Sequence, residues 1–211
     1  MLFIFDWDGT LIDSAERIVN AMQAAADDCR LEVCTAAAVR DIIGLGLPEA
    51  IATLYPQLDA ERRAELQQTY AQCYVAADQQ PCAFFPGVHE TLSALKARGA
   101  TLAVATGKSR RGLQRVLTQL DMLDFFDATR CADETRSKPH PQMLHELLVE
   151  FGRDADAAVM IGDTEYDMAM ARNASMPRIA VDYGAHHVER LLPYEPALVL
   201  SEFAGLLEWQ G

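Results

Sequence analysis

The chain opens with a short continuous run of apolar residues, "LFIF" at positions 2–5, which ends abruptly in charge. Such a run is typical of a strand that is buried on both of its faces. Apolar residues then recur at helical spacing from Ile18 to Cys29, and helical patterns continue over 35–44, 47–55 and 59–77. The pattern therefore predicts one buried strand followed by an all-helical segment over residues 14–83.

From residue 84 onward, apolar runs and amphipathic stretches alternate. Strands are predicted at "TLAVAT", "ATRC", "AAVMI", "RIAV" and "ALVL", and helices over 88–97, 109–120, 140–151 and 165–173. This alternation is typical of an α/β protein with a parallel sheet flanked by helices, joined by right-handed crossovers. We expect residues 1–13 and 84–211 to form this core, and residues 14–83 to be inserted into it.

Composition limits the possible partners. The 211 residues include 18 basic and 31 acidic side chains, which gives a formal net charge of −13. A chain this acidic repels nucleic acid and anionic membrane surfaces, so neither is an expected partner. An anionic small molecule would need a local cation at its binding site.

The cysteines and the N-terminus indicate where the protein resides. The five cysteines are an odd number without C-x-x-C spacing, which predicts neither a disulfide framework nor a zinc site. The N-terminus lacks the features of a signal peptide, and no apolar run approaches the roughly 20 residues that span a bilayer. We expect a soluble, cytoplasmic protein.

Polar residues cluster where the predicted strands end. Ligands of open parallel sheets bind outside the carboxyl ends of the strands, so residues at these ends should meet at one edge. The residues concerned are Asp6 and Asp8 after the first strand, Thr106, Gly107 and Lys108 after the second, Lys138 after the weak third, and Asp163 and Asp167 after the fourth.

These residue types suggest phosphoryl chemistry. Carboxylates without clustered His or Cys favour a hard cation, most often Mg²⁺, and Asp6, Asp8 and Asp163 are the candidates. The ammonium of Lys138 and the hydroxyl of Thr106 suit a phosphoryl group. Asp6 could attack phosphorus, while Asp8 protonates the leaving oxygen and later deprotonates water.

Each of these residues has an ordinary structural explanation as well. "DG" is a common turn dipeptide, Asp163 could cap a helix, and Lys138 could be an exposed loop lysine. The joint occurrence at strand ends of one sheet argues against four separate coincidences. Ser14 is expected to cap the first helix, and His186 and His187 are expected at the surface.

Taken together, "DWDGT", "ATGK", "SKPHP" and "GDTEYD" resemble the four motifs of the haloacid dehalogenase superfamily, most closely its phosphoglycolate phosphatase-like branch. The resemblance implies a Rossmann-like core with a helical C1-type cap. It also implies a set of roles: Asp6 as nucleophile, Asp8 as acid/base, Thr106, Gly107 and Lys138 as phosphate-binding residues, Asp6, the Asp8 main-chain carbonyl and Asp163 as Mg²⁺ ligands, and Asp167 as a supporting residue.

The residues also discriminate among reactions of that superfamily. Its dehalogenases lack the second aspartate, its phosphonate hydrolases use a cap lysine, and its sugar-phosphate mutases use a cap histidine and lysine. Asp8 is present here, and residues 14–83 contain neither lysine nor histidine. We therefore expect Mg²⁺-dependent hydrolysis of a small phosphomonoester such as phosphoglycolate.

Several alternatives remain open. The substrate could be a sugar phosphate or a nucleotide monophosphate, the enzyme could be a phosphomutase, or the fold could serve as a non-catalytic phosphate-binding module. The loop over 42–49 and the nearby Arg40 are expected to contact the substrate, which should be a small phosphorylated metabolite. The protein is expected to act as a monomer or a homodimer.

Overall fold

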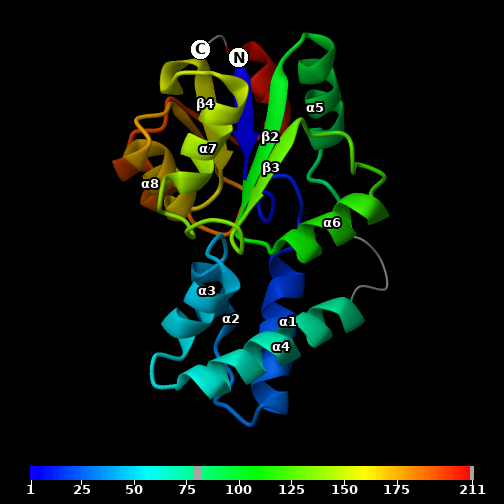
Figure 1. Ribbon diagram of the computed structural model, residues 1–211, viewed down its shortest axis with the longest axis vertical. Helices are drawn as coiled ribbons and strands as arrows, with labels where there is room; N and C mark the ends of the chain where they lie inside the picture. The colour runs from blue at the N-terminus through cyan, green and yellow to red at the C-terminus, as the bar shows by residue number, and fades with distance from the viewer. Residues whose placement is uncertain (78–81, 210–211) are drawn as a thin grey trace.

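The computed structural model describes residues 1–77 and 82–209 and centres on a six-stranded parallel sheet (Figure 1). The strand order is β3-β2-β1-β4-β5-β6, so the first strand lies in the middle. The α/β class predicted from the alternating pattern is confirmed. The strands are β1 (Leu2–Phe5), β2 (Thr101–Thr106), β3 (Ala128–Cys131), β4 (Ala158–Gly162), β5 (Arg178–Val181) and β6 (Leu198–Leu200).

The central position of β1 explains its continuous apolar run. It pairs with β2 on one side and β4 on the other, and all four of its residues are buried. Because side chains alternate along a strand, Phe3 and Phe5 face one side of the sheet while Leu2 and Ile4 face the other. Each face therefore needs its own covering layer.

Two layers of helices supply that cover. Phe3 and Phe5 pack against apolar residues of α5 (Val88–Ala97), α6 (Arg110–Gln119) and the C-terminal 3-10 helix η4 (Phe203–Glu208). Leu2 and Ile4 pack against methionines and leucines of α7 (Gln142–Phe151) and α8 (Glu165–Asn173). The sheet is thus sandwiched between helices, and its carboxyl ends are left available for a site.

The segment between β1 and α5 forms a separate helical bundle, here called the helical insertion. Its helices are α1 (Ala15–Asp28), α2 (Ala36–Asp41), α3 (Leu47–Leu54) and α4 (Ala60–Ala76). They enclose their own apolar core, with Met22, Ile51 and Leu66 almost fully buried. Figure 1 shows the insertion beyond the carboxyl ends of the strands. Residues 78–81 of the predicted 14–83 segment lie outside the described residues.

The chain after β5 and β6 forms only short 3-10 helices. They are η2 (Val188–Arg190), η3 (Leu192–Tyr194) and η4, in addition to η1 (Ala155–Ala157) ahead of β4. Pro193 lies within η3, and proline at the start of a turn does not allow the helix to extend back through it. Among the described residues, none of the helices has the length and apolarity needed to span a membrane.

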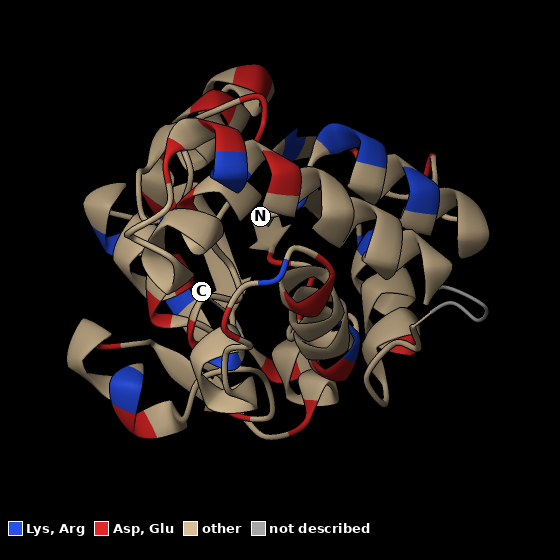
Figure 2. Cartoon of the chain, turned by 90° about the horizontal axis from the view of Figure 1, so that it is seen from below, with Lys and Arg blue, Asp and Glu red and all other residues tan. Residues whose placement is uncertain are grey.

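Basic and acidic residues, blue and red on the ribbon, are interspersed along the helices in the view from the side of the insertion (Figure 2). The excess of acidic residues is therefore distributed over the molecule. Three acidic side chains nonetheless form a compact group inside it, at the carboxyl end of the sheet.

Candidate active site

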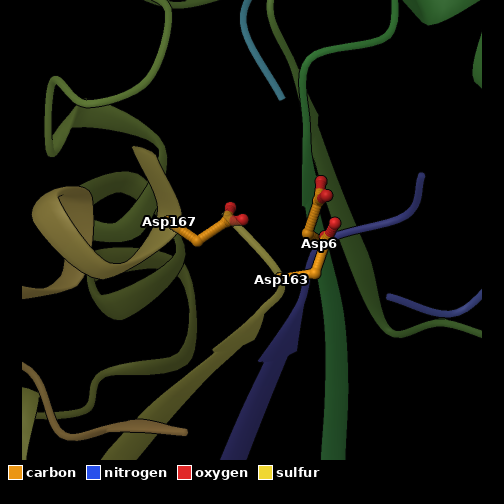
Figure 3. Close-up of side chains that lie close together, drawn as sticks. All are labelled: Asp6, Asp163 and Asp167. Carbon is orange, nitrogen blue, oxygen red and sulfur yellow. The ribbon is translucent and has the colours of Figure 1, made fainter. Parts of the chain in front are cut away.

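Three buried carboxylates meet at the carboxyl edge of the sheet. Asp6 follows β1, Asp163 follows β4, and Asp167 lies in the first turn of α8. One oxygen from each lies within 4.8 Å of the others. In Figure 3 the side chains of Asp6 and Asp163 lie side by side, and Asp167 reaches toward them from its helix. The predicted convergence of residues far apart in sequence is therefore observed for this group.

Lys138 supplies the cation inside this group. Its Nζ lies 2.5 Å from Oδ1 of Asp6 and 2.7 Å from Oδ1 of Asp167, and its side chain is completely buried. Burial favours the neutral amine, but the two carboxylates outweigh it and raise the pKa of Lys138 above its ordinary value. The lysine is therefore charged, and it links the ends of β1 and α8.

Asp167 is held by its own helix. Its Oδ2 accepts hydrogen bonds from the backbone N–H of Thr164, at 3.1 Å, and from the Thr164 hydroxyl, at 2.7 Å. Thr164 in turn caps the first turn of α8, which completes a reciprocal capping box. Because Oδ1 bonds Lys138, both oxygens of Asp167 already have protein partners. This arrangement suits a residue that orients the lysine.

Asp163 is fixed from two sides. The Thr10 hydroxyl donates to Oδ1 at 2.7 Å, and the Ala185 N–H donates to Oδ2 at 2.7 Å. Gly9 packs directly against it at a φ of +86°, where an added Cβ would lie 2.2 Å from Oδ2 of Asp163. Burial, followed by the charge of Asp167, raises the pKa of Asp163 to about 7.

Asp6 carries the unusual atom of the group. Its Oδ2 is buried and has no hydrogen-bond partner among the described residues. Burial raises the pKa of Asp6 well above the ordinary value, since Lys138 only partly offsets it and Asp167 and Asp163 add repulsion. Three carboxylates and one ammonium leave an excess of negative charge, so the unpaired oxygen and the oxygen-only donor set fit a divalent cation such as Mg²⁺.

Asp8 lies outside this group. Strand β1 ends at Phe5, and the chain then turns, with the N–H groups of Leu11 and Ile12 donating to the carbonyl of Trp7. Oδ1 of Asp8 instead accepts from the Ser14 hydroxyl at 2.6 Å and from Lys108 Nζ at 2.9 Å. The two aspartates of "DWD" therefore avoid repulsion because each is paired with a different lysine.

The expectation that Ser14 caps the first helix is wrong. Ser14 is the residue before α1, but its side chain makes no capping hydrogen bond. Its hydroxyl binds Asp8 instead. A serine hydroxyl can donate and accept at once, but here it is turned toward the carboxylate, to which it donates, and it accepts no bond from the first turn of α1.

Thr106 and Gly107 lie where the core meets the helical insertion. Thr106 is fully buried at the end of β2, and its hydroxyl oxygen accepts from the N–H of Lys108 at 3.1 Å. An added Cβ on Gly107 would lie 2.5 Å from the carbonyl oxygen of Leu45 and 2.7 Å from that of Gly44. The predicted substrate loop thus packs directly on the second motif.

Further contacts hold this seam closed. The N–H of Gly46 donates to the Ser137 hydroxyl at 2.8 Å, beside Lys138. The Tyr166 hydroxyl donates to the carbonyl of Asp41 at 2.9 Å. The seam, defined here as the contacts of residues 41–46 with the core, is formed largely by backbone atoms of the insertion.

His186 corrects another expectation. It is only 2% exposed, whereas His187 lies at the surface as predicted. Its Nδ1 accepts from the Glu165 N–H at 3.2 Å, and its Nε2 lies 3.2 Å from the carbonyl oxygen of Asp41. This pair of contacts requires the neutral ring with its proton on Nε2. A buried histidine thus joins α8 to the seam.

Sequence reasoning assigned no role to several residues around the site. Lys108 was noted at a strand end, but its pairing with Asp8 depends on the turn after β1. Tyr74 of α4 and His186 were not connected with the site at all. One signal was available: the chain contains only three lysines, Lys96, Lys108 and Lys138, and two of them follow predicted strands.

Comparison with known proteins agrees with this geometry. Residues 3–181 match the family model described as haloacid dehalogenase-like hydrolase. The chain is 35% identical to "Probable phosphatase IndB" of Dickeya dadantii, over 96% of this chain and 90% of that protein. It is 31% identical to the phosphoglycolate phosphatase of Vibrio cholerae, over 98% of this chain and 95% of that protein.

Solved structures show the same fold over nearly the whole chain. A hydrolase from Pseudomonas syringae superposes with a TM-score of 0.90 at 24% identity, covering 99% of this chain and 96% of its own. A predicted phosphoglycolate phosphatase from Haemophilus somnus superposes with a TM-score of 0.86 at 26% identity, covering 98% and 96%. The chain belongs to the haloacid dehalogenase-like hydrolases.

Proposed function

We propose that the protein is a Mg²⁺-dependent phosphatase that hydrolyses a small phosphomonoester through an aspartyl-phosphate at Asp6. The carrying observation is the buried, unpartnered Oδ2 of Asp6 inside a group of three carboxylates and one lysine. Phosphatase activity is supported by the names of the relatives. Their names also make phosphoglycolate the first substrate to test.

The metal site would use oxygen donors already present. Asp6 and Asp163 would ligate through carboxylates, and Asp8 through its main-chain carbonyl. Asp167 would remain with Lys138, because its Oδ1 is bound by the charged ammonium, whereas the two oxygens of Asp163 accept only from neutral donors. When bound, Mg²⁺ would offset the negative charge shared by the nucleophile and the phosphoryl oxygens.

The chain's own groups would perform the transfer. The Asp6 carboxylate attacks phosphorus, the bond from phosphorus to the leaving oxygen breaks, and Asp8 gives that oxygen a proton. Asp8 then takes a proton from the water that attacks the aspartyl-phosphate, which releases phosphate and restores Asp6. Two carboxylates in separate environments suit this division of labour.

Three groups would hold the phosphoryl oxygens during both steps. Lys138 contributes its charged ammonium, Thr106 its hydroxyl proton, and Gly107 its backbone N–H. We further infer that residues 14–83 act as a cap on a core of residues 1–13 and 84–211. Closure of the seam would exclude bulk water from the leaving-group side.

The test is hydrolysis of p-nitrophenyl phosphate with Mg²⁺, compared with the same assay in EDTA. We expect turnover only with the metal, and its loss in Asp6→Asn. Asp13→Asn is the matched control, because Asp13 is an exposed carboxylate in the same segment. Beryllium fluoride with Mg²⁺ should form an adduct at Asp6, detectable by fluorine NMR.

Two results would contradict the proposal. Full activity in Asp6→Asn would remove the nucleophile, and the lack of any turnover across phosphoglycolate, sugar phosphates and nucleotide monophosphates would favour a phosphate-binding module. The same panel ranks these substrate classes against one another.

A further inference from the structure

Each of the two lysines near the active site pairs with a different aspartate of "DWD". Lys138 pairs with Asp6, the proposed nucleophile, and Lys108 pairs with Asp8, the proposed acid/base. Lys108 stands in the turn after β2, and its side chain is only 11% exposed. Lys138 has a role in the proposed mechanism, as a phosphate-binding residue, whereas Lys108 has none.

The ammonium of Lys108 also contacts the helical insertion. Its Nζ lies 3.4 Å from the hydroxyl of Tyr74 on α4 and 4.9 Å from the centroid of that ring. The guanidinium groups of Arg17 and Arg115 lie 5.9 Å and 5.7 Å from the same centroid. Cations from the insertion and from the core therefore surround the Tyr74 ring. Cation–π attraction to these groups stabilises the ring in this place.

These contacts leave the two oxygens of Asp8 in different states. Oδ1 accepts from both Lys108 and Ser14, whereas no hydrogen bond from a described residue to Oδ2 is observed. A small cavity of about 10 Å³, the space of roughly one water molecule, is lined by residues that include Asp8, Arg17 and Tyr74. An acid that must deliver a proton needs one oxygen held and the other accessible.

We propose that Lys108 is a positioning residue for the acid/base. It binds one oxygen of Asp8 so that the other oxygen faces the leaving group. Through its contact with Tyr74, this position of Lys108 depends on the helical insertion being packed against the core. The inference rests on the proposed function. It assigns Lys108 no contact with the phosphoryl group.

A different role for Lys108 would be direct binding of an anionic group on the substrate. The geometry favours positioning, because the nearest partner of the ammonium is the Asp8 carboxylate at 2.9 Å. The two roles differ in which substrates they affect. Positioning matters for leaving groups that need a proton, whereas anion binding matters for leaving groups that carry a charge.

The experiment measures kcat/KM for three substrates with Mg²⁺. p-Nitrophenyl phosphate has a leaving group that departs without protonation, ethyl phosphate has a neutral one that needs a proton, and phosphoglycolate has an anionic one that needs a proton. The parameter kcat/KM reports steps up to the release of the leaving group, so the later role of Asp8 toward water does not enter.

Lys108→Met should lower kcat/KM about 100-fold for ethyl phosphate and for phosphoglycolate, but less than about fivefold for p-nitrophenyl phosphate. Lys108→Arg should restore part of the loss because it keeps a charged donor. Tyr74→Phe, which removes only the hydroxyl, should give a smaller loss with the same substrate dependence. Lys96→Met is the control and should change none of these values, because Lys96 is an exposed lysine in the last turn of α5 that bonds the Phe125 carbonyl and neither aspartate.

Inhibition by inorganic phosphate should be unchanged in Lys108→Met, which shows that the phosphoryl site is intact. Equal losses for all three substrates would overturn the inference, as would a loss confined to phosphoglycolate. If Lys108→Met does not fold, equal losses in Tyr74→Phe have the same meaning. A wild type that is inactive on all three substrates overturns the proposed function, and this inference with it.

Discussion

The acidic group in the core and the seam between core and insertion are built in opposite ways. In the core, the Lys138 ammonium binds the carboxylates of Asp6 and Asp167 directly, and Lys138 and Asp167 are fully buried. At the seam, backbone carbonyls and N–H groups of residues 41–46 meet the core, as with Gly46 and Ser137. The core thus fixes charges mainly with other charges, whereas the seam depends mainly on close backbone approach, with one exposed ion pair between Asp41 and Arg190.

This difference has an energetic basis. A buried ion pair that loses one partner leaves an uncompensated charge, which costs several kcal/mol. A backbone contact at a seam can instead be exchanged for water when the two bodies separate. The core group should therefore resist perturbation, and the seam should be able to open and close around a substrate.

The largest expected effect comes from breaking the core group. Lys138→Met leaves Asp6 and Asp167 facing each other without the cation. We expect activity to fall about 10³-fold and the free energy of unfolding to fall by about 3–5 kcal/mol. Urea denaturation and phosphatase assays measure the two losses, and Lys96→Met again provides the control. A stable Lys138→Met protein with near-normal turnover would contradict the comparison.

The next effect tests the seam. Gly107→Ala would place a Cβ within 2.5 Å of the Leu45 carbonyl oxygen, which the insertion can avoid only by moving away. We expect kcat/KM to fall about 10- to 100-fold because closure is impaired, with the free energy of unfolding changed by less than about 1 kcal/mol.

Gly112→Ala is the control for that substitution, because its Cβ would meet only the Ser109 hydroxyl oxygen, at 3.3 Å. If Gly107→Ala destabilised the whole protein as strongly as Lys138→Met, the seam would be as rigid as the core. That outcome would remove the distinction between the two regions.

Metal binding should act on the core group and depend on pH. The pKa of Asp163 is raised to about 7 by burial, so below that pH a metal must displace its proton. We expect the apparent Mg²⁺ affinity to fall by about tenfold or more per pH unit below 7, because Asp163 and Asp6, whose pKa is also raised, must both lose a proton to bind the metal. The rise in melting temperature that Mg²⁺ induces, compared at pH 6 and pH 8, measures this affinity. Asp163→Asn should abolish the rise at both pH values.

The smallest effect concerns the buried histidine at the seam. Burial, with a contribution from Arg190, lowers the pKa of His186 below its ordinary value of 6.5. The unfolded chain therefore binds the proton more readily, so the stabilisation by neutral His186 is present above pH 6.5 and is lost as the pH falls below it.

His186→Gln should consequently cost about 1 kcal/mol of unfolding free energy at pH 7.5, and less at pH 5.5. Urea denaturation at both values checks this, with the exposed His187→Gln as control. A cost that is the same at both pH values would show that the ring is not held neutral by its contacts with Glu165 and Asp41.

The sequence predicted the core well because its signals are local. The apolar run of β1 and the alternation after residue 84 are direct consequences of burial, and they indicated the sheet and its carboxyl edge. The approach of Asp6 and Asp163 followed, since parallel strand ends meet at one edge. However, Asp8 lies outside the acidic group in which it was expected, and Asp167 lies inside it. The seam was not predicted, because contacts such as Gly107 against the carbonyls of 44 and 45 involve backbone atoms that any sequence possesses.

The errors have the same origin. Ser14 and His186 were assigned from local propensity, as a helix cap and a surface residue, but each is engaged by a partner that comes close only in the folded chain. The pairing of Lys108 with Asp8 spans 100 positions in the sequence. Residue types could indicate that cations were needed near the aspartates, but not which lysine would serve which aspartate.

The family match ends at residue 181, yet the support of the acidic group does not. Beyond that point Ala185 donates to Asp163, and the Tyr183 hydroxyl donates to the carbonyl of Thr10, whose own side chain also binds Asp163. A shortened chain ending at β5 would keep all four motifs intact. It would still lose Ala185, which bonds Asp163 directly, and Tyr183, which bonds the Thr10 carbonyl. Possession of the motifs is therefore a poor criterion for choosing where such a protein can be cut.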